Sequence, residues 1–151
     1  MKPEKIRVIA ICVFRNGNKI LAFEGYDTIK QQPYHRPLGG TVEFGERSDQ
    51  AVIREIKEEI NAEVTDLRYL GAIENIFIYE GNKGHELVQV YDGRFVDESL
   101  YEKSIIQGIE QSSPFRAVWV DLEKTGNGYP PLYPTGLVEL LESTKSSKIP
   151  A

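Results

Sequence analysis

The chain has 151 residues, one cysteine and a formal net charge of −5, with 40% hydrophobic and 27% charged residues. These values are typical of one globular domain that buries a core without disulfides, and no apolar run approaches the roughly 18 residues that cross a bilayer. No signal peptide is recognisable, so we expect a cytoplasmic protein. The acidic balance argues against broad nucleic-acid binding but not against a nucleotide substrate.

The first third of the chain predicts a strand hairpin. Residues 6–14 are β-branched and aromatic with little polar interruption, which indicates a buried strand. Asn16-Gly17 is typical of a hairpin turn, and residues 19–23 fit the returning strand. The polar residues 25–32 are expected to form a loop. Cys12 lies within the first strand, so we expect a buried and unreactive thiol.

A helix is predicted within residues 37–64, the most informative stretch of the sequence. A segment that contains three glycines leads to Ser48 and Asp49, either of which can accept from free backbone amides at a helix start. The helix is expected to end at about Ile60, because apolar residues recur with helical spacing. They are Val52, Ile53, Ile56 and Ile60.

Three carboxylates lie together on this helix. Glu55, Glu58 and Glu59 are three and four residues apart, where like charges destabilise a helix by roughly 0.2–0.5 kcal/mol per pair. A hard cation such as Mg²⁺ would compensate them, since it binds carboxylate, water and phosphate oxygens. The alternative is an ordinary solvated face with Arg54 and Lys57 nearby. The spacing alone does not decide between the two.

The rest of the chain predicts further strands and one more helix. Residues 64–79 fit one long or bulged strand, and the turn at 80–84 would close a hairpin onto residues 85–96. Residues 97–111 show no clear pattern. Residues 115–120 alternate as a strand does, and residues 135–142 fit an amphipathic helix that covers the sheet.

The glycines and acids of the central stretch have a recognisable spacing. Gly40 is followed after five residues by Glu46, and after seven more by Arg54-Glu-Ile-Lys-Glu-Glu. From Gly40 to Ala62 this resembles the Nudix box in its MutT-like form. The one departure is Asn61, where the family has glycine. Asn is the next best residue for a left-handed position after a helix, so we expect the substitution to be tolerated.

The resemblance implies a fold and an activity. The fold would be a Nudix-type α/β/α sandwich with a mixed β-sheet, in a single domain over residues 1–142 followed by a flexible tail, 143–151. The activity would be hydrolysis of a diphosphate bond in a nucleotide or a nucleoside-diphosphate-linked small molecule, with Mg²⁺ or Mn²⁺ as cofactor. Family members often dimerise, so a homodimer is possible.

The resemblance also implies roles for the box residues. Glu55 and Glu59 would be the principal metal ligands, together with the backbone carbonyl of Gly40. Glu58 would be a further ligand or the base that activates water.

Two further box residues would position the ligands. Arg54 would orient the glutamates, and Glu46 would brace the loop against the helix. An ordinary ion pair between Arg54 and Glu46 is the alternative.

Candidates outside the box concern the substrate and the base. In the fold that the chain resembles, the segment before the box lies beside the cleft, so Arg36 could meet a phosphate and Tyr34 could stack on a base. An exposed arginine and a packing tyrosine are the alternatives. Some relatives take their base from outside the box, so three further glutamates are candidates for the base: Glu74, Glu86 and Glu110. Glu86 is the first to test, and it is also a candidate substrate contact.

Other functions of the fold remain as alternatives. A noncatalytic domain could sense a phosphorylated metabolite, although three facing glutamates argue for catalysis. Isomerase chemistry on an isoprenoid diphosphate would need a catalytic cysteine and a His-rich site, whereas this chain has Cys12 in a strand and two isolated histidines. RNA 5′-end hydrolysis is a minor alternative. We expect a small nucleotide-type substrate, no membrane association and no stable nucleic-acid partner.

Overall fold

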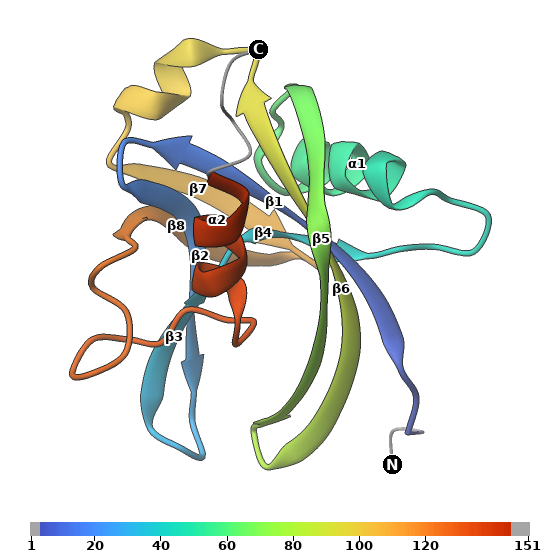
Figure 1. The fold of residues 1–151 in the computed structure, drawn as a ribbon, viewed down its shortest axis with the longest axis vertical. Coiled ribbons are helices and arrows are strands. Elements are labelled where there is room, and N and C mark those ends of the chain that lie inside the picture. Colours follow the sequence, from blue (N-terminus) through green and yellow to red (C-terminus); the bar gives the residue numbers. More distant parts are fainter. Residues whose placement is uncertain (1–3, 146–151) are drawn as a thin grey trace.

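The computed structural model describes residues 4–145. Within that range, eight strands, one 3₁₀ helix (η1) and two α-helices follow one another along the chain (Figure 1). In order they are β1 (Arg7–Asn16), β2 (Lys19–Asp27), β3 (Gln32–Arg36), β4 (Leu38–Thr41), α1 (Ser48–Ile60), β5 (Val64–Tyr79), β6 (Asn82–Phe95), η1 (Glu98–Glu102), β7 (Ile105–Glu110), β8 (Ser113–Asp121) and α2 (Leu137–Lys145).

The strands form one mixed sheet that opens into two halves. Its order is β5-β6-β1-β2-β8-β7, with β4 paired to β1 and β3 paired to β2. β1 runs parallel to β6 and antiparallel to β2 and β4. β1 pairs with β2 next to their turn, at Arg15 with Ile20 and Asn16 with Lys19. From this junction the β2–β3 and β5–β6 hairpins extend toward the same end of the molecule (Figure 1).

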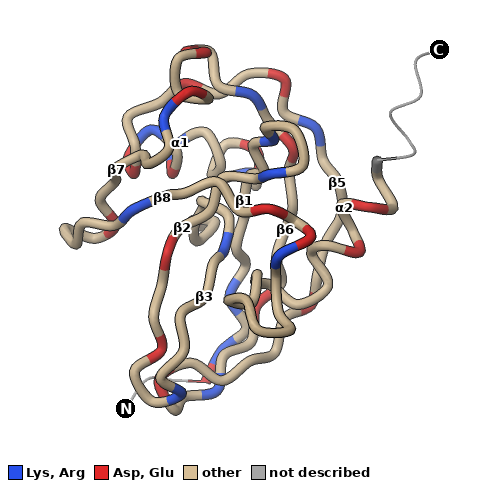
Figure 2. Tube along the Cα trace, turned by 90° about the vertical axis from the view of Figure 1, so that its left-hand side faces the viewer, with Lys and Arg blue, Asp and Glu red and all other residues tan. Residues whose placement is uncertain are grey.

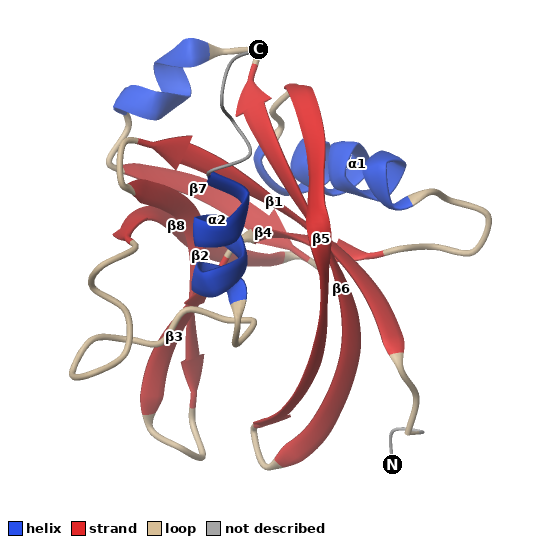
Figure 3. Cartoon of the chain, in the orientation of Figure 1, coloured by secondary structure: helices blue, strands red, loops and turns tan. Residues whose placement is uncertain are grey.

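Alternating side chains of β1 divide the interior into two cores. Ala10, Cys12 and Phe14 pack with residues of α1, whereas Ile9, Ile11 and Val13 pack with residues of α2. Figure 3 shows the strands between these two helices. The predicted α/β/α sandwich with a mixed sheet is therefore confirmed.

Most of the predicted strands are confirmed. The segments at 6–14, 19–23, 85–96 and 115–120 fall in β1, β2, β6 and β8, with ends that differ by a few residues. β5 is the long, bulged strand that was expected, with register shifts between Thr65 and Arg68 and between Tyr69 and Gly71. Cys12 is buried, and burial raises the pKa of its thiol, as expected of an unreactive cysteine.

The expected loop at residues 25–32 is wrong in part. β2 continues to Asp27 and β3 begins at Gln32, so these residues form most of a hairpin. Its side chains, which are mostly polar and exposed apart from the buried Asp27, do not show the apolar alternation from which strands are predicted.

β4 was missed because it contains two glycines, which indicate a turn. A Cβ on Gly39 would lie 2.1 Å from the carbonyl oxygen of Ala10, so close approach of β4 to β1 requires glycine. Residues 97–111, which showed no pattern, form η1 and β7.

The C-terminal end of α1 follows the sequence, whereas its N-cap is Arg47 and neither Ser48 nor Asp49. Asp49 accepts from the Gln50 amide at 2.9 Å, whereas the Ser48 hydroxyl hydrogen-bonds the Tyr91 hydroxyl at 2.6 Å. Asn61 adopts the left-handed conformation with φ 53° and ψ 42°, and its amide donates to the Lys57 carbonyl at 3.0 Å. Asn61 therefore acts as the expected C-terminal cap.

The second helix extends further than predicted. α2 ends at Lys145, so its last turn overlaps residues 143–145, which we assigned to the tail. The remainder of that tail, 146–151, lies outside the described residues. None of the helices within 4–145 is both long and apolar enough to span a membrane.

Candidate active site

Arg54 connects the helix, the preceding loop and β4. Its Nε and Nη2 donate to the two carboxylate oxygens of Glu46 at 2.7 and 3.0 Å, and Nη2 also donates to the Thr41 carbonyl at 3.0 Å. Its Nη1 donates to Glu55 at 2.9 Å and to Glu58 at 3.3 Å. One guanidinium group therefore holds three carboxylates and the end of β4 in place.

Glu46 fixes the loop that precedes the helix. Besides its two bonds from Arg54, its Oε1 accepts from the Glu43 amide at 3.1 Å. The hydrogen bonds from Arg54 lower the pKa of Glu46, so its carboxylate stays ionised at neutral pH. These are the contacts expected of a residue that braces the loop against the helix.

Gly40 brings backbone against the Glu55 carboxylate. A Cβ at Gly40 would lie 2.5 Å from the carboxyl carbon of Glu55, a distance that real side chains do not adopt. Gly40 also pairs with Ala10 in the middle of β1, which fixes its position in the sheet. The structure therefore places backbone of β4 beside a glutamate of α1, the pair that the resemblance implies for metal binding.

Glu59 is the buried member of the glutamate set. It is 6% exposed, and its Oε1 is a buried atom without a hydrogen-bond partner. The pKa of Glu59 is raised to about 9, first by burial and then by the neighbouring carboxylates of Glu110 and Glu55. A buried carboxylate beside two others is costly unless a proton or a cation compensates it.

Glu110 and Arg36 join this cluster from the other half of the sheet. Arg36, at the end of β3, donates through Nη2 to both oxygens of Glu110, at 3.3 and 3.1 Å. Glu110, at the end of β7, lies close enough to Glu59 to raise the pKa of that residue. The guanidinium carbon of Arg36 also lies 4.5 Å from the Phe23 ring centre. Arg36 thus contacts an acid of the cluster and an aromatic ring.

Tyr34 lies among other aromatic rings further along β3. Its ring centre is 5.9 Å from that of Tyr79 and 5.7 Å from that of Tyr133. The Tyr34 ring packs directly over Gly25 of β2. A Cβ on Gly25 would lie 2.2 Å from that ring, so the ring can occupy this position only because Gly25 has no side chain. Burial raises the pKa of Tyr34 to about 12. The half-buried ring packs within the protein, two residues before Arg36 and on the same face of β3.

The other candidate glutamates have different surroundings. Glu58 is the most exposed member of the helix set, with a side chain that is 60% exposed. Glu74 is exposed on β5, and Glu86 on β6 forms an ion pair with Arg7 at 3.7 Å. Among the three glutamates outside the box, Glu110 is the one that the structure brings next to Glu59.

The donors of the cluster suit a hard divalent cation. Within residues 4–145, no three acidic, His or Cys side chains are already grouped closely enough to hold an ion, and Arg54 holds Glu55 and Glu58 on its guanidinium. The unpartnered Oε1 of Glu59 and the backbone of Gly40 beside Glu55 nevertheless supply oxygen donors of the kind that Mg²⁺ and Mn²⁺ prefer. The chemistry of these donors therefore suits such a metal.

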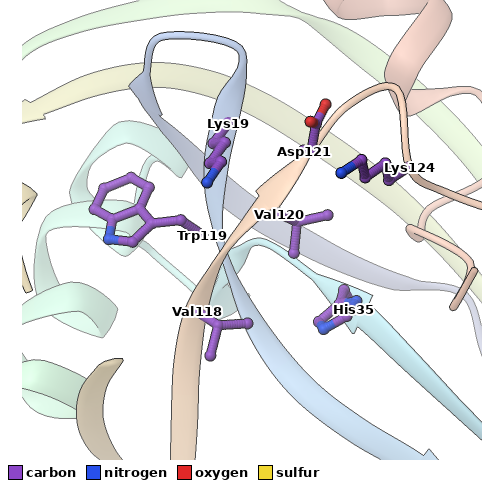
Figure 4. A pocket seen from close by; sticks show the side chains of 7 residues that line it. All are labelled: Lys19, His35, Val118, Trp119, Val120, Asp121 and Lys124. Atoms are coloured by element: carbon purple, nitrogen blue, oxygen red, sulfur yellow. The ribbon is translucent and has the colours of Figure 1, made fainter. Parts of the chain in front are cut away.

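Basic and acidic residues are mixed along the described trace, and a cavity lies away from the box. Figure 2 shows Lys and Arg interspersed with Asp and Glu along the trace. A surface cavity of about 360 Å³ beside β2 and β8 shares no lining residue with the box. Its Trp119 points away from Val118 and Val120, so these side chains do not converge on a common space (Figure 4).

The model of the NUDIX domain family matches residues 4–140 of the chain. The chain belongs to the Nudix family. Among curated Nudix relatives, the NAD-capped RNA hydrolase NudC of Vibrio atlanticus is 37% identical over an alignment of 67 residues, and the match covers 41% of this chain and 22% of that protein. The putative mutator protein MutT4 of Mycobacterium tuberculosis is 33% identical over 66 residues, 44% of this chain and 27% of that protein. The matches therefore span about a quarter of those relatives.

Solved structures show the same fold at low sequence identity. A Nudix hydrolase from Nitrosomonas europaea superimposes with a TM-score of 0.67 at 19% identity. The match covers 95% of this chain and 91% of the Nitrosomonas chain. A MutT Nudix hydrolase from Burkholderia pseudomallei gives a TM-score of 0.64 at 21% identity, and covers 91% and 98%. At these identities the likeness establishes the Nudix fold.

Sequence reasoning located the helix acids but not how Glu110 and Arg36 meet them. The two residues are 74 positions apart, and each ends a strand that the sequence did not predict. Ile106, Gly108 and Glu110 share one face of β7, but Ile105 and Ile109 on the opposite, exposed face remove the apolar-polar alternation that would have predicted the strand.

Proposed function

We propose that this Nudix protein is a divalent-metal-dependent hydrolase that cleaves a diphosphate bond in a nucleotide or a nucleoside-diphosphate-linked small molecule. The carrying observation is the buried Glu59, whose unpartnered oxygen lies in a cluster with Glu55 and Glu110. A cluster of carboxylates that is costly without a cation is well suited to bind one. Family membership supports the same chemistry.

The proposed metal ligands are Glu55, Glu58, Glu59 and the Gly40 carbonyl. When bound, Mg²⁺ or Mn²⁺ would neutralise charge on the phosphate oxygens and lower the pKa of the attacking water. Arg54 contacts two of these glutamates, which supports a positioning role.

The water-activating base is proposed to be a carboxylate at the edge of this cluster. Glu58 remains a candidate because it is exposed beside the other ligands. Glu110 is the candidate from outside the box, because it reaches the cluster from β7. Glu74 and Glu86 are less favoured by their surroundings on β5 and beside Arg7.

The substrate is proposed to lie along the face of β3. Arg36 would contact a phosphate, since its guanidinium lies next to the acid cluster. The nucleoside would then extend toward Tyr34, whose ring is half-buried beside Tyr79. Glu86 stays a further candidate contact on the hairpin opposite β3. A homodimer and a cytoplasmic location also stay predictions.

A hydrolysis screen tests this proposal. Purified protein is incubated with Mg²⁺ or Mn²⁺ and one member each of oxidised nucleoside triphosphates, ADP-ribose, nucleotide sugars and dinucleoside polyphosphates, and products are identified by mass. NAD-capped RNA is added as a further substrate because a relative carries that activity in its name. We expect metal-dependent cleavage at a diphosphate bond. Tight ligand binding without turnover in any arm would instead support the noncatalytic sensor.

A further inference from the structure

The tips of the β2–β3 and β5–β6 hairpins lie side by side and are hydrogen-bonded to each other (Figure 1). The Glu80 carboxylate of one tip accepts from the Thr28 amide of the other at 2.6 Å, and also from the Thr28 hydroxyl. Lys30 Nζ donates to the Ile78 carbonyl at 2.6 Å. We call these four residues, together with Asp27, the hairpin clasp.

Asp27 connects the clasp to the backbone of both turns. Its Oδ1 accepts from the amides of Ile29 and Lys30 in its own turn, and its Oδ2 accepts from the Glu80 amide in the other. The β5–β6 turn is tight, because Glu80 and Gly81 both have a positive φ, 50° and 77°, as in a two-residue type I′ turn. The clasp therefore joins two short turns through a buried carboxylate.

The proposed substrate path along β3 ends at this clasp. Arg36, Tyr34 and Gln32 lie on one face of β3, and Gln32 pairs with Asp27 of the clasp. At about 3.3 Å per residue, Tyr34 lies roughly 7 Å from Arg36 along the strand, and the clasp lies roughly 13 Å from it. A phosphate at Arg36 and a nucleoside at Tyr34 would therefore take up the strand that precedes the clasp.

Aromatic rings are already in contact just before the clasp. The ring centres of Tyr34 and Tyr79 are 5.9 Å apart, and the two rings are nearly perpendicular, at 79°. Tyr133 contacts Tyr34 from another direction, at 5.7 Å. Because an edge-to-face pair leaves no space for a third ring, a base can pack against the exposed part of Tyr34 but cannot pass between Tyr34 and Tyr79.

The clasp also carries negative charge. Asp27 and Glu80 supply two carboxylates, and Lys30 supplies one ammonium group, 4.0 Å from Asp27. The hydrogen bond from the Lys30 amide, followed by those from the amides of Glu80 and Ile29, lowers the pKa of Asp27, so this carboxylate is ionised at neutral pH. A polynucleotide that continued past Tyr34 would bring its next phosphate toward these like charges.

We propose that the hairpin clasp closes the substrate site beyond Tyr34, so that the nucleoside bound there must be a free, terminal one. A nucleotide whose 3′ oxygen continues into a polynucleotide would be rejected on this side of the acid cluster, by contact with the clasp and by charge repulsion. This inference rests on the proposed substrate path along β3. It assigns to the clasp the choice between a free nucleotide and a nucleotide within a chain.

Ligands without a diphosphate bond test this inference by binding alone. Nucleoside 5′-monophosphates with each of the four RNA bases are titrated by calorimetry in Mg²⁺, and so are the corresponding 5′-phosphorylated dinucleotides. Diphosphate hydrolysis cannot consume either ligand. For the base that binds best, the wild type should bind the mononucleotide about tenfold or more tightly than the dinucleotide, because only the dinucleotide meets the clasp.

A double variant opens the clasp without changing its net charge. Glu80→Asn keeps a residue that suits the type I′ turn but removes the carboxylate that binds Thr28, and Lys30→Met removes the ammonium group that binds the Ile78 carbonyl. The ratio of the two affinities should then fall about tenfold, toward equal binding. If the double variant does not fold, Glu80→Asn alone tests the clasp.

The matched control makes the same two substitutions at the other end of the sheet. Glu123→Asn with Lys124→Met changes exposed residues in the turn after β8, where the Leu122 amide donates to the Asn18 carbonyl beside the β1–β2 turn. This control should keep the affinity ratio of the wild type.

Three results would overturn the proposal. The first is equal affinity of the wild type for the mononucleotide and the dinucleotide, and the second is an unchanged ratio in the clasp variant. The third is the absence of binding for every mononucleotide, which would remove the path along β3. Hydrolysis without this discrimination would refute the clasp and leave the proposed function standing, whereas discrimination without hydrolysis would do the reverse.

Discussion

At the scale of single residues, Arg54 has the most contacts with other candidate residues. Its guanidinium binds Glu46, Glu55, Glu58 and the Thr41 carbonyl, and its side chain is 24% exposed. Removal of this guanidinium group leaves several carboxylates close together without the positive charge that pairs with all of them. The site and the local fold therefore depend on the same side chain.

Arg54→Ala is expected to lower the free energy of unfolding by about 2 kcal/mol, because partly buried acceptors lose charged hydrogen bonds. Urea denaturation followed by circular dichroism measures the difference. The matched control is Arg116→Ala, an exposed ion pair that should change stability by about 0.5 kcal/mol or less. Equal losses of unfolding free energy in the two variants would show that the Arg54 network stabilises the protein no more than an exposed ion pair does.

Gly40→Ala separates activity from stability. The added methyl group would meet the end of the Glu55 side chain, which can move aside, so the unfolding free energy should fall by about 1 kcal/mol or less. Displacement of the Glu55 carboxylate should nevertheless lower kcat about tenfold or more, because ligand placement matters in steps of 1 Å. Unchanged hydrolysis rates would contradict the proposed pairing of Gly40 with Glu55.

At the scale of elements, Asn61 decides how α1 ends. Its left-handed conformation is one that glycine adopts freely, Asn tolerates and Ala resists. Asn61→Ala should therefore lower the free energy of unfolding by about 1 kcal/mol. The free energy of unfolding of Asn61→Gly should stay within about 0.5 kcal/mol of the wild-type value. Thermal unfolding of the three proteins provides the test. A fully stable Asn61→Ala protein would refute this explanation of the cap.

The sequence predicted the elements whose signals are local. The box is contiguous, and its helix has both apolar spacing and recognisable end residues, so α1 and its acids could be placed. β3 and β4 were not predicted because β3 is short and mostly polar and β4 contains Gly39 and Gly40. The contact of Arg36 with Glu110 depends on how β3 and β7 meet in space, which no short pattern encodes.

At the scale of the whole molecule, the tips of the two hairpins are joined through Asp27. This carboxylate is 3% exposed and accepts from the amides of Ile29 and Lys30 at 3.0 Å and from the amide of Glu80 at 3.1 Å. Lys30 also donates to the Ile78 carbonyl at 2.6 Å. The two halves of the sheet, which separate at the β1–β2 junction, are thereby held together again at their far ends.

Asp27 makes stability depend on acid. The amide of Lys30, followed by those of Glu80 and Ile29, lowers the pKa of Asp27 below its unfolded value. Its stabilising effect is therefore present above the unfolded pKa of about 3.9 and is lost as the pH falls through the lower folded pKa. Asp27→Asn should destabilise the protein at pH 7.

The difference from wild type should shrink below about pH 4, as the native carboxylate is protonated. Chemical denaturation at several pH values measures it, with Glu142→Gln on the exposed face of α2 as a control. A stability difference that stays constant from pH 7 to about pH 2 would contradict the role of the ionised Asp27.

The most direct test of the central claim compares the hydrolysis rate of the wild type with that of Glu59→Gln, which keeps the shape of the side chain but removes its charge. Glu142→Gln, on the exposed face of α2, serves as the matched control. With Mg²⁺ or Mn²⁺ we expect Glu59→Gln to lose about a hundredfold or more in kcat, and Glu142→Gln to retain wild-type turnover. A Glu59→Gln protein that hydrolyses the substrate at the wild-type rate would contradict the assignment of metal-dependent catalysis to the acids of α1.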